Sequence, residues 1–240
     1  MGQRLGQHFL ASKPVLKKIA DAACGDACPL LIEIGPGRGA LTELLAPRAD
    51  RMIAIELDPP LVDYIRYHYP SIEVIHSNVL DVDLNQWGSC SIVGNLPYYI
   101  TSPIVEKVAA LGSLCEKAIL MMQKEVAERL IAKPGSRDYG YLSVSTQVRA
   151  DVKYLFTVPR GAFQPPPKVE SAVIQLIPKS DPVPAGFIKF AGHCFRHKRK
   201  MLRNNLNGIH PEIHEFPEAS LRAEQLSVEQ LLHLYSRLVS

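Results

Sequence analysis

Short apolar runs alternate with amphipathic stretches along the first half of the chain. Five runs have the length and continuity of strands buried on both faces, and these are 30–34, 51–57, 72–75, 91–93 and 117–122. The stretches between them favour helices at about 39–46, 60–68, 102–111 and 123–132. Strands that alternate with helices predict a parallel sheet covered on both faces.

The pattern changes after residue 150. Two apolar runs, 152–158 and 171–177, are joined by a proline-rich loop too short for a crossover helix, which favours an antiparallel pair. Parallel strands followed by such a pair resemble the Rossmann-like sheet of class I methyltransferases, an α/β fold. Residues 178–184 have the composition of a linker, and the patterns beyond them are helical. We therefore expect two domains, 1–178 and 185–240, the second small and all-helical.

Charge is distributed unevenly between these two domains. The chain of 240 residues has 27 Lys and Arg against 24 Asp and Glu, a net charge of +3. Nine of the basic and six of the acidic residues lie from Lys179 onward, so residues 1–178 hold eighteen of each. The excess at the carboxyl-terminal end predicts an anionic partner there.

Other totals exclude several classes of protein. No apolar run approaches the length of a membrane span, so we expect no membrane association. Five cysteines, an odd number, do not indicate a disulfide framework and favour a cytoplasmic protein. Cys24 and Cys28 have no second Cys/His pair after them, so we expect no metal site.

A glycine-rich loop follows the first predicted strand. Gly35 and Gly37 let the backbone pass close to a ligand at the carboxyl edge of the sheet. Glu56, 21 residues beyond Gly35, ends the second strand, where its carboxylate could accept both hydroxyls of a ribose. These features fit NAD and S-adenosylmethionine equally, and a tight turn with a solvated glutamate would need neither.

The fourth predicted strand ends in Asn95-Leu96-Pro97-Tyr98, which favours the second of these cofactors. The exocyclic nitrogen of adenine is a weak nucleophile because its lone pair is delocalised into the ring. Acceptors aimed at its two hydrogens would localise that pair, and we predict them to be the Asn95 side-chain oxygen and a carbonyl near Leu96. Pro97 stiffens the turn and Tyr98 is predicted to stack on the base, so catalysis rests on positioning and electrostatics.

Phe163 stands at the head of the three prolines 165–167. We predict that its ring is the second stacking surface, opposite Tyr98, around a flipped-out or unpaired adenine. The alternative is that Phe163 is a core aromatic that anchors the hairpin.

The densest basic run of the chain spans 195–206. At helical spacing Phe195, Leu202 and Leu206 would face inward and the cations outward, toward RNA phosphates. The predicted RNA-binding residues are Arg196, Lys198, Arg199, Lys200 and Arg203.

Several separated motifs together resemble the ribosomal RNA small-subunit adenine N6-dimethyltransferase family. They lie at 6–10, 33–42, 55–58, 95–98, 123–129 and 158–172. The resemblance covers nearly the whole chain and implies an enzyme that uses S-adenosylmethionine and no metal. It implies dimethylation of the N6 amines of two adjacent adenosines in a hairpin near the 3′ end of small-subunit (16S) ribosomal RNA, in ribosome biogenesis. A pre-assembled 30S particle is then the expected substrate, and a monomer the expected state.

The resemblance also implies which residues contact the cofactor. They are His8, Leu10, Gly35, Gly37, Glu56, Asn78 and Asn95. The family most often has Asn in place of His8 and Asp in place of Asn78. An amide at position 78 can accept from the adenine amine of the cofactor but carries no charge, so we expect binding to be weaker by about 1 kcal/mol.

Other functions remain open on the sequence. The nearest is the related macrolide-resistance type of enzyme, which methylates large-subunit RNA, although the basic run and the motif at 7–10 favour the small subunit. DNA adenine methyltransferases usually carry Asp-Pro-Pro-Tyr where this chain has 95–98. An NAD-dependent oxidoreductase would leave Asn95 and the basic run unexplained. A non-catalytic RNA-binding protein of the same fold is the last alternative.

Overall fold

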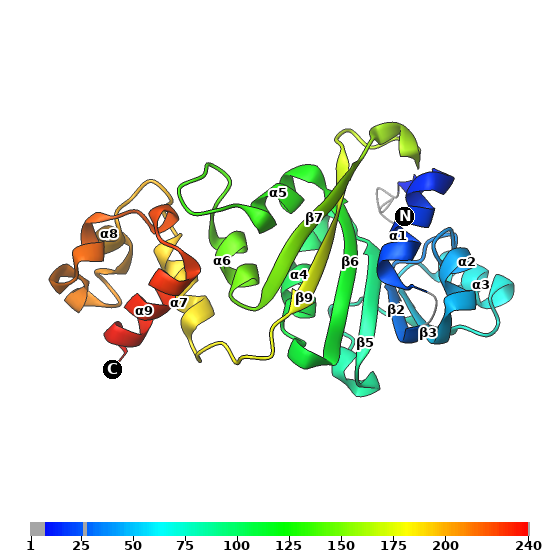
Figure 1. Cartoon of the computed structure of the whole chain (residues 1–240), viewed down its shortest axis with the longest axis horizontal. Helices are drawn as coiled ribbons and strands as arrows, with labels where there is room; N and C mark the ends of the chain where they lie inside the picture. The colour runs from blue at the N-terminus through cyan, green and yellow to red at the C-terminus, as the bar shows by residue number, and fades with distance from the viewer. Residues whose placement is uncertain (1–7, 26–27, 240) are drawn as a thin grey trace. The chain divides into compact units, whose positions relative to one another are not determined.

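The computed structural model describes residues 8–25 and 28–239, and the chain divides into two compact units (Figure 1). The first unit runs to Ala127 and includes Asp151–Ser180, while the second combines Glu128–Ala150 with Asp181–Ser240. The predicted boundary assigned 128–150 to the first domain. The structure differs because Tyr139, Val144 and Val148 are buried in the hydrophobic core of the second unit.

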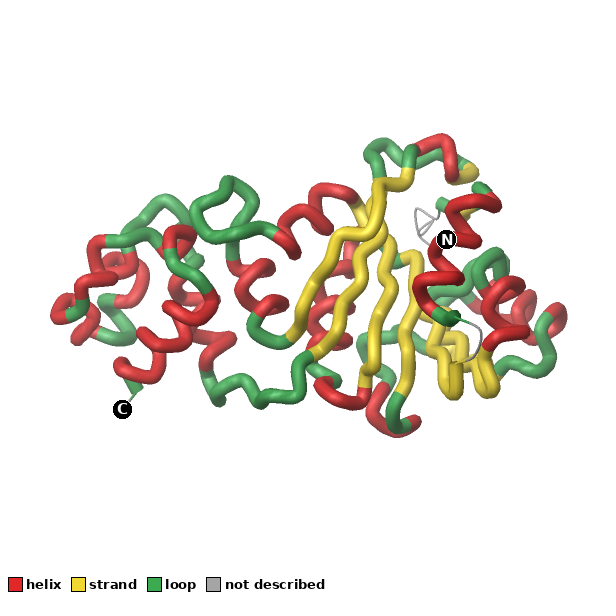
Figure 2. The backbone as a smooth tube through the Cα atoms, in the orientation of Figure 1, coloured by secondary structure: helices red, strands yellow, loops and turns green. Residues whose placement is uncertain are grey.

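A seven-stranded sheet forms the centre of the first unit (Figure 2). Its strands in spatial order are β4 (Glu73–His76), β3 (Ala49–Glu56), β2 (Cys28–Ile34), β5 (Cys90–Asn95), β6 (Cys115–Gln123), β9 (Ser171–Pro178) and β7 (Ala150–Val158). Neighbouring strands from β4 to β6 are parallel, and β9 runs antiparallel to β6. The predicted fold class, a mostly parallel methyltransferase-like sheet with an antiparallel late strand, is confirmed.

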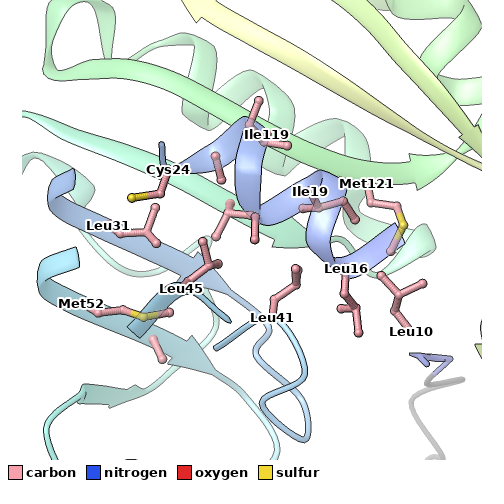
Figure 3. Close-up of a cluster of buried hydrophobic side chains, with 14 of the residues drawn as sticks. Leu10, Leu16, Ile19, Cys24, Leu31, Leu41, Leu45, Met52, Ile119 and Met121 are labelled. Carbon is pink, nitrogen blue, oxygen red and sulfur yellow. The ribbon is translucent and has the colours of Figure 1, made fainter. Parts of the chain in front are cut away.

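Both faces of this sheet are buried, as the unbroken apolar runs require. The helices of this unit are α1 (Lys13–Ala23), which precedes β2, α2 (Thr42–Leu45), α3 (Pro59–His68) and α4 (Thr101–Ala109), and α5 (Lys124–Ile131) begins here and extends past the unit boundary. On one face, Leu16 and Ile19 of α1 pack near Leu31, Ile119 and Met121 of the sheet (Figure 3). Intervening strand residues such as Ile32, Ile92 and Leu120 are equally buried, and α4 packs against β6 and β9.

Two elements of the first unit, a helix and a small sheet, were not predicted. Helix α1 has Leu16, Ile19, Ala20 and Ala23 at helical spacing on its buried side, so the sequence carried its signal. The second element is a two-stranded antiparallel sheet of β1 (Phe9–Leu10) and β8 (Phe163–Gln164), in which Leu10 opposes Phe163. Because its strands lie far apart in the chain, no local pattern indicates this pairing.

The second unit is helical, as predicted. Its helices are α6 (Tyr141–Gln147), α7 (Phe187–Cys194), α8 (Leu202–Leu206) and α9 (Val228–Leu238), connected by turns and 3₁₀ segments. Helix α9 begins with the predicted capping box, in which the Ser227 hydroxyl accepts from the Gln230 amide at 3.2 Å and the Gln230 side chain accepts from the Ser227 amide at 2.8 Å. Along the described residues, no helix combines the length and apolarity needed to cross a bilayer.

Candidate active site

A cavity of about 870 Å³ opens at the carboxyl ends of β2, β3 and β5 in the first unit. This volume is within the range of about 300–1,000 Å³ usual for small-molecule sites. The predicted residues that line it are His8, Leu10, Gly35, Glu56, Asn78, Asn95, Leu96 and Tyr98. Glu33 and Gln164 also line it and were not predicted as site residues. Residues 6 and 7 of the amino-terminal motif lie outside the described part of the chain.

The glycine loop after β2 places backbone amides around the Glu56 carboxylate. One carboxylate oxygen accepts from the amide of Gly37 at 3.2 Å, and the other accepts from the amides of Leu57 and Asp58 at 2.8 and 3.0 Å. Glu56 is 7% exposed and lines the cavity, whereas Gly37 contributes through this bond. The carboxylate is therefore fixed at the end of β3 with lone pairs remaining for further donors.

Two glycines of the loop have conformations that other residues rarely adopt. Gly35 and Gly37 have φ values of +68° and +59°. A Cβ on Gly35 would lie 3.8 Å from the Asn95 carbonyl oxygen, and one on Gly37 would lie 3.2 Å from the Phe9 ring. The Arg38 guanidinium covers one face of the Phe9 ring, 4.8 Å from the ring centroid. The loop thus keeps the cavity open while it packs on the amino-terminal segment.

Glu33 is a buried carboxyl group on the cavity wall. It is 1% exposed, and the Thr42 hydroxyl donates to it at 2.6 Å. The pKa of Glu33 is raised to about 7, first by burial and to a smaller extent by the nearby Glu56 carboxylate, while the Thr42 hydrogen bond opposes the rise. Burial therefore favours the neutral form of this group.

Asn78 lines the cavity just beyond β4. Its side-chain oxygen already accepts from the backbone amide of Leu80 at 3.1 Å, which forms a tight turn. The oxygen keeps a second lone pair, so the acceptor predicted at this position is present but shared.

Asn95 is the last residue of β5 and its side chain is oriented by the amino-terminal segment. The side-chain nitrogen donates to the carbonyl oxygen of His8 at 3.3 Å, which leaves the side-chain oxygen as an acceptor. Leu96 follows, and its amide donates to the Met121 carbonyl at 2.9 Å, which continues the β5–β6 ladder. The end of the strand is therefore held on both sides.

Tyr98 begins the short 3₁₀ turn that leads into α4. Its hydroxyl is hydrogen-bonded to the Ser171 hydroxyl at 2.8 Å, and burial raises the pKa of Tyr98 above its usual value. The ring of His8 stacks toward it, with centroids 6.1 Å apart and planes inclined by 30°. His8 is held in turn by a 2.9 Å hydrogen bond between its Nδ1 and the Pro165 carbonyl oxygen.

Phe163 does not lie with the other predicted catalytic residues. It is 2% exposed, it is absent from the cavity lining, and it packs in the core with Leu10, Val158 and Ala162. The predicted position of its ring, facing Tyr98 across the cavity, is therefore not observed. This buried position is the placement of the alternative, a core aromatic that anchors the hairpin.

The basic run of the second unit is exposed but is not one helix. Helix α7 ends at Cys194 and α8 begins at Leu202, so the cations occupy a turn and the start of α8. All five predicted RNA-binding residues are exposed, and Leu202 and Leu206 are buried as expected. Lys198 is held by the carbonyl of Arg137 and by the Glu224 carboxylate at 3.6 Å.

Comparison with known proteins places this geometry in a family context. A family model described as ribosomal RNA adenine dimethylase matches residues 2–239. Proteins called ribosomal RNA small subunit methyltransferase A are similar over nearly their whole lengths. The one from Acidobacterium capsulatum is 42% identical, and the match covers 98% of this chain and 90% of that protein. The one from Chlorobium phaeobacteroides strain BS1 is also 42% identical, and the match covers 98% of this chain and 93% of that protein.

Solved structures agree with the sequence relatives. A dimethyladenosine transferase from Plasmodium falciparum superposes with a TM-score of 0.82 at 26% identity, over 97% of this chain and 98% of that one. The 23S rRNA methyltransferase ErmE superposes with a TM-score of 0.69 at 26% identity, over 97% and 100%. The likeness is greater to the first structure.

Proposed function

The chain belongs to the ribosomal RNA adenine dimethylase family, and we propose that it dimethylates the N6 amines of two adjacent adenosines near the 3′ end of small-subunit ribosomal RNA. The activity is S-adenosylmethionine-dependent methyl transfer to ribosomal RNA. The proposal rests above all on Asn95, whose amide nitrogen is tied to His8 so that its oxygen is left to accept at the cavity.

The cavity fits S-adenosylmethionine through the chemistry of its donors and acceptors. Glu56 supplies a fixed carboxylate for ribose hydroxyls, Asn78 an amide oxygen for an adenine amine, and Gly35 the open space that a Cβ would fill. When bound there, the cofactor supplies an activated methyl group. The neighbouring carboxyl groups of Glu33 and Glu56 favour a ligand that carries positive charge.

Asn95 and Leu96 would prepare the target amine for attack. The Asn95 side-chain oxygen accepts one amine hydrogen and the Leu96 carbonyl oxygen accepts the other, so the nitrogen lone pair is localised rather than shared with the ring. Both acceptors lie at the end of β5, where the Leu96 amide donates a hydrogen bond to the Met121 carbonyl of β6 and fixes the backbone. The acceptors are preorganised, so little reorganisation is needed at the moment of transfer. The proton is lost after the transfer, so no strong base is required.

Tyr98 and His8 would hold the adenine ring. Tyr98 offers a ring whose orientation is fixed by the bond to Ser171, and His8 offers a roughly parallel ring on the other side. This arrangement replaces the predicted Tyr98–Phe163 pair, since Phe163 is buried in the core.

We propose further that the substrate is a pre-assembled small-subunit particle, approached by a monomer in the cytoplasm. The exposed cations Arg196, Arg199, Lys200 and Arg203 are suited to backbone phosphates. Contacts of this kind give affinity without base specificity, so the choice of adenosine is left to the cavity in the first unit.

Mass mapping of methylated nucleosides tests the reaction directly. Under-methylated small subunits and, separately, large subunits are incubated with the full chain and labelled S-adenosylmethionine. We expect two methyl groups on each of two adjacent adenosines near the 3′ end of the small-subunit RNA. Asn95→Ala should lower the rate by roughly a hundredfold to a thousandfold, as the loss of one preorganised group does.

The large subunit decides between this proposal and the resistance type of activity. Methyl transfer confined to large-subunit RNA would contradict the proposal. RNA binding without any methyl transfer would indicate the non-catalytic alternative.

A further inference from the structure

A second cavity, of about 800 Å³, lies wholly within the second unit. It is bordered by α6, the residue after its last turn, and α7 with the loop before it. The lining residues that matter here are Tyr141, Arg149, Lys189, Gly192, His193 and Arg196. We call it the α6–α7 cavity. Only Arg196 among these belongs to the basic run described above.

The α6–α7 cavity is strongly cationic. Arg149, Lys189 and Arg196 line it, and among the residues that the structure describes no Asp or Glu does. Within the described part of the chain none of these three cations makes an ion pair, in contrast to Lys198 with Glu224. The pKa of His193, which also lines the cavity, is lowered first by burial and then by the positive charges of Lys189 and Arg196 and by His210. Uncompensated cations around a cavity favour an anionic ligand.

The backbone adds to the same potential. Gly186, with φ of +85°, precedes the first residue of α7, and both Gly186 and Ile188 line the cavity. The amino end of α7 therefore opens on the cavity, where helix amides and the helix dipole favour negative charge.

One wall of the cavity is aromatic. Tyr141 is half-buried at the start of α6, and Gly192 of α7 lies beside its ring, since a Cβ built on Gly192 would be 3.7 Å from it. A residue without a side chain at position 192 leaves the space next to the ring open. A flat aromatic surface next to cations is the combination with which proteins hold a single unpaired nucleotide.

We propose that the α6–α7 cavity binds one unpaired nucleotide of the RNA substrate, with its base against Tyr141 and its phosphate between Arg149, Lys189 and Arg196. The inference rests on the proposed function in that the ligand is taken to be RNA. It adds a second nucleotide site to the one in the first unit and gives Arg149 and Lys189, which lie outside the basic run, a part in substrate recognition.

Two variants of the full chain separate a shaped site from a merely basic surface. Arg149→Ala with Lys189→Ala removes two cations, whereas Gly192→Leu fills the space beside Tyr141 and keeps every charge. The matched control is Lys133→Ala with Arg137→Ala, which removes two exposed cations of the same unit that do not line the cavity. Thermal melts establish that each variant is folded.

The readout is the affinity for unmethylated small-subunit ribosomal RNA, transcribed in vitro, at several salt concentrations. We expect at least a tenfold loss for the Arg149/Lys189 variant, with a salt slope shallower by about 0.7, the value for one phosphate contact on a single strand. Gly192→Leu should weaken binding severalfold, and the control should stay within about twofold of the wild type. Ultraviolet crosslinking of the unaltered chain to the same RNA should place an adduct on the peptide that contains Tyr141, a result that does not depend on any variant folding.

Three results would overturn the inference. The first is wild-type affinity in both cavity variants, and the second is the absence of an adduct near Tyr141. The third is that the cavity variants lose affinity for assembled small subunits but keep wild-type affinity for naked RNA. That result would mean that a protein occupies the cavity. Methyl transfer by the wild type is scored separately. If Gly192→Leu transfers methyl groups with an unaltered KM for RNA, only the proposal of a nucleotide site in the α6–α7 cavity is rejected. If the wild type binds RNA through the cavity but transfers no methyl group, only the proposed reaction is rejected.

Discussion

The rings of His8 and Tyr98, which both line the active-site cavity, stack with centroids 6.1 Å apart and planes inclined by 30°. Stacked bases along one strand are spaced by about 3.4 Å, so a base between two rings needs roughly 6.8 Å. The pair is therefore slightly closer than a sandwiched adenine requires. A small outward movement of His8 would admit the base, and the base would then touch both rings.

Replacement of His8 tests this clamp. We expect His8→Ala to raise KM for the RNA about tenfold, because one stacking surface is lost and base–aromatic stacking contributes roughly 1–3 kcal/mol. His8→Phe keeps a ring and should retain most of the affinity. Steady-state kinetics on small subunits, with a parallel titration of S-adenosylmethionine, give the answer. An unchanged KM for RNA with a large loss of cofactor affinity would instead assign His8 to the cofactor alone.

Phe163 should behave as a core residue. Phe163→Ala is expected to lower the free energy of unfolding by about 3–5 kcal/mol, the usual cost of deleting a buried phenyl ring. Phe163→Leu, which fills much of the space, should cost less and leave kcat nearly unchanged. Denaturant unfolding and methyl transfer are measured on the same samples. A stable Phe163→Ala protein with lost turnover would restore the stacking role predicted from the sequence.

Glu33 should make the stability of the first unit depend on pH. Its pKa is about 7 in the folded chain against 4.5 for the ordinary group, so between these values the folded state holds more protons than the unfolded state. Stability from this group is therefore full below about pH 4.5 and is lost as pH rises through 7, by at most about 3 kcal/mol.

The matched variant for that measurement is Glu33→Gln, which keeps the shape and cannot ionise. Its unfolding free energy should vary less than that of the wild type between pH 5 and 8, as followed by urea unfolding at each pH. Parallel curves for the two proteins would show that the Glu33 proton has no such role.

Asn78→Asp should strengthen cofactor binding. A carboxylate is the stronger acceptor for an amine, and we expect about fivefold tighter binding of S-adenosylmethionine, equivalent to about 1 kcal/mol. The turn through the Leu80 amide should survive, because a carboxylate oxygen can accept the same bond. Calorimetric titration of the purified chain measures the change, with Asn78→Ala as the reference for loss of the acceptor. Equal affinity of wild type and Asn78→Asp would dispose of the idea.

Much of the architecture was readable from periodicity. Continuous apolar runs placed all five parallel strands to within a few residues, because a strand buried on both faces needs apolar side chains at every position. The glycines at 35 and 37 and the acid at 56 marked the carboxyl edge of the sheet, since a strand end and a tight turn are local features. The capping box at Ser227 was equally local and was found where predicted.

Helix α6 and the 128–150 segment were less accessible. The segment lies between two strands of the first unit in the chain, so sequence order assigns it there. Its apolar side chains are nevertheless buried with α7 and α9. Chain order says nothing about which core an amphipathic segment joins, because both cores would accept the same apolar residues.

The sequence by itself determined the fold class, the family and the strand ends that carry Glu56 and Asn95, because each depends on residues close together in the chain. Only the tertiary structure decided which ring faces Tyr98 and which cations share a cavity. The hydrogen bond between His8 and Pro165 joins residues 157 positions apart, and β1 pairs with β8 from the other end of the first unit's sequence. Such pairings follow from the packing of distant segments, and periodicity within one segment does not encode them.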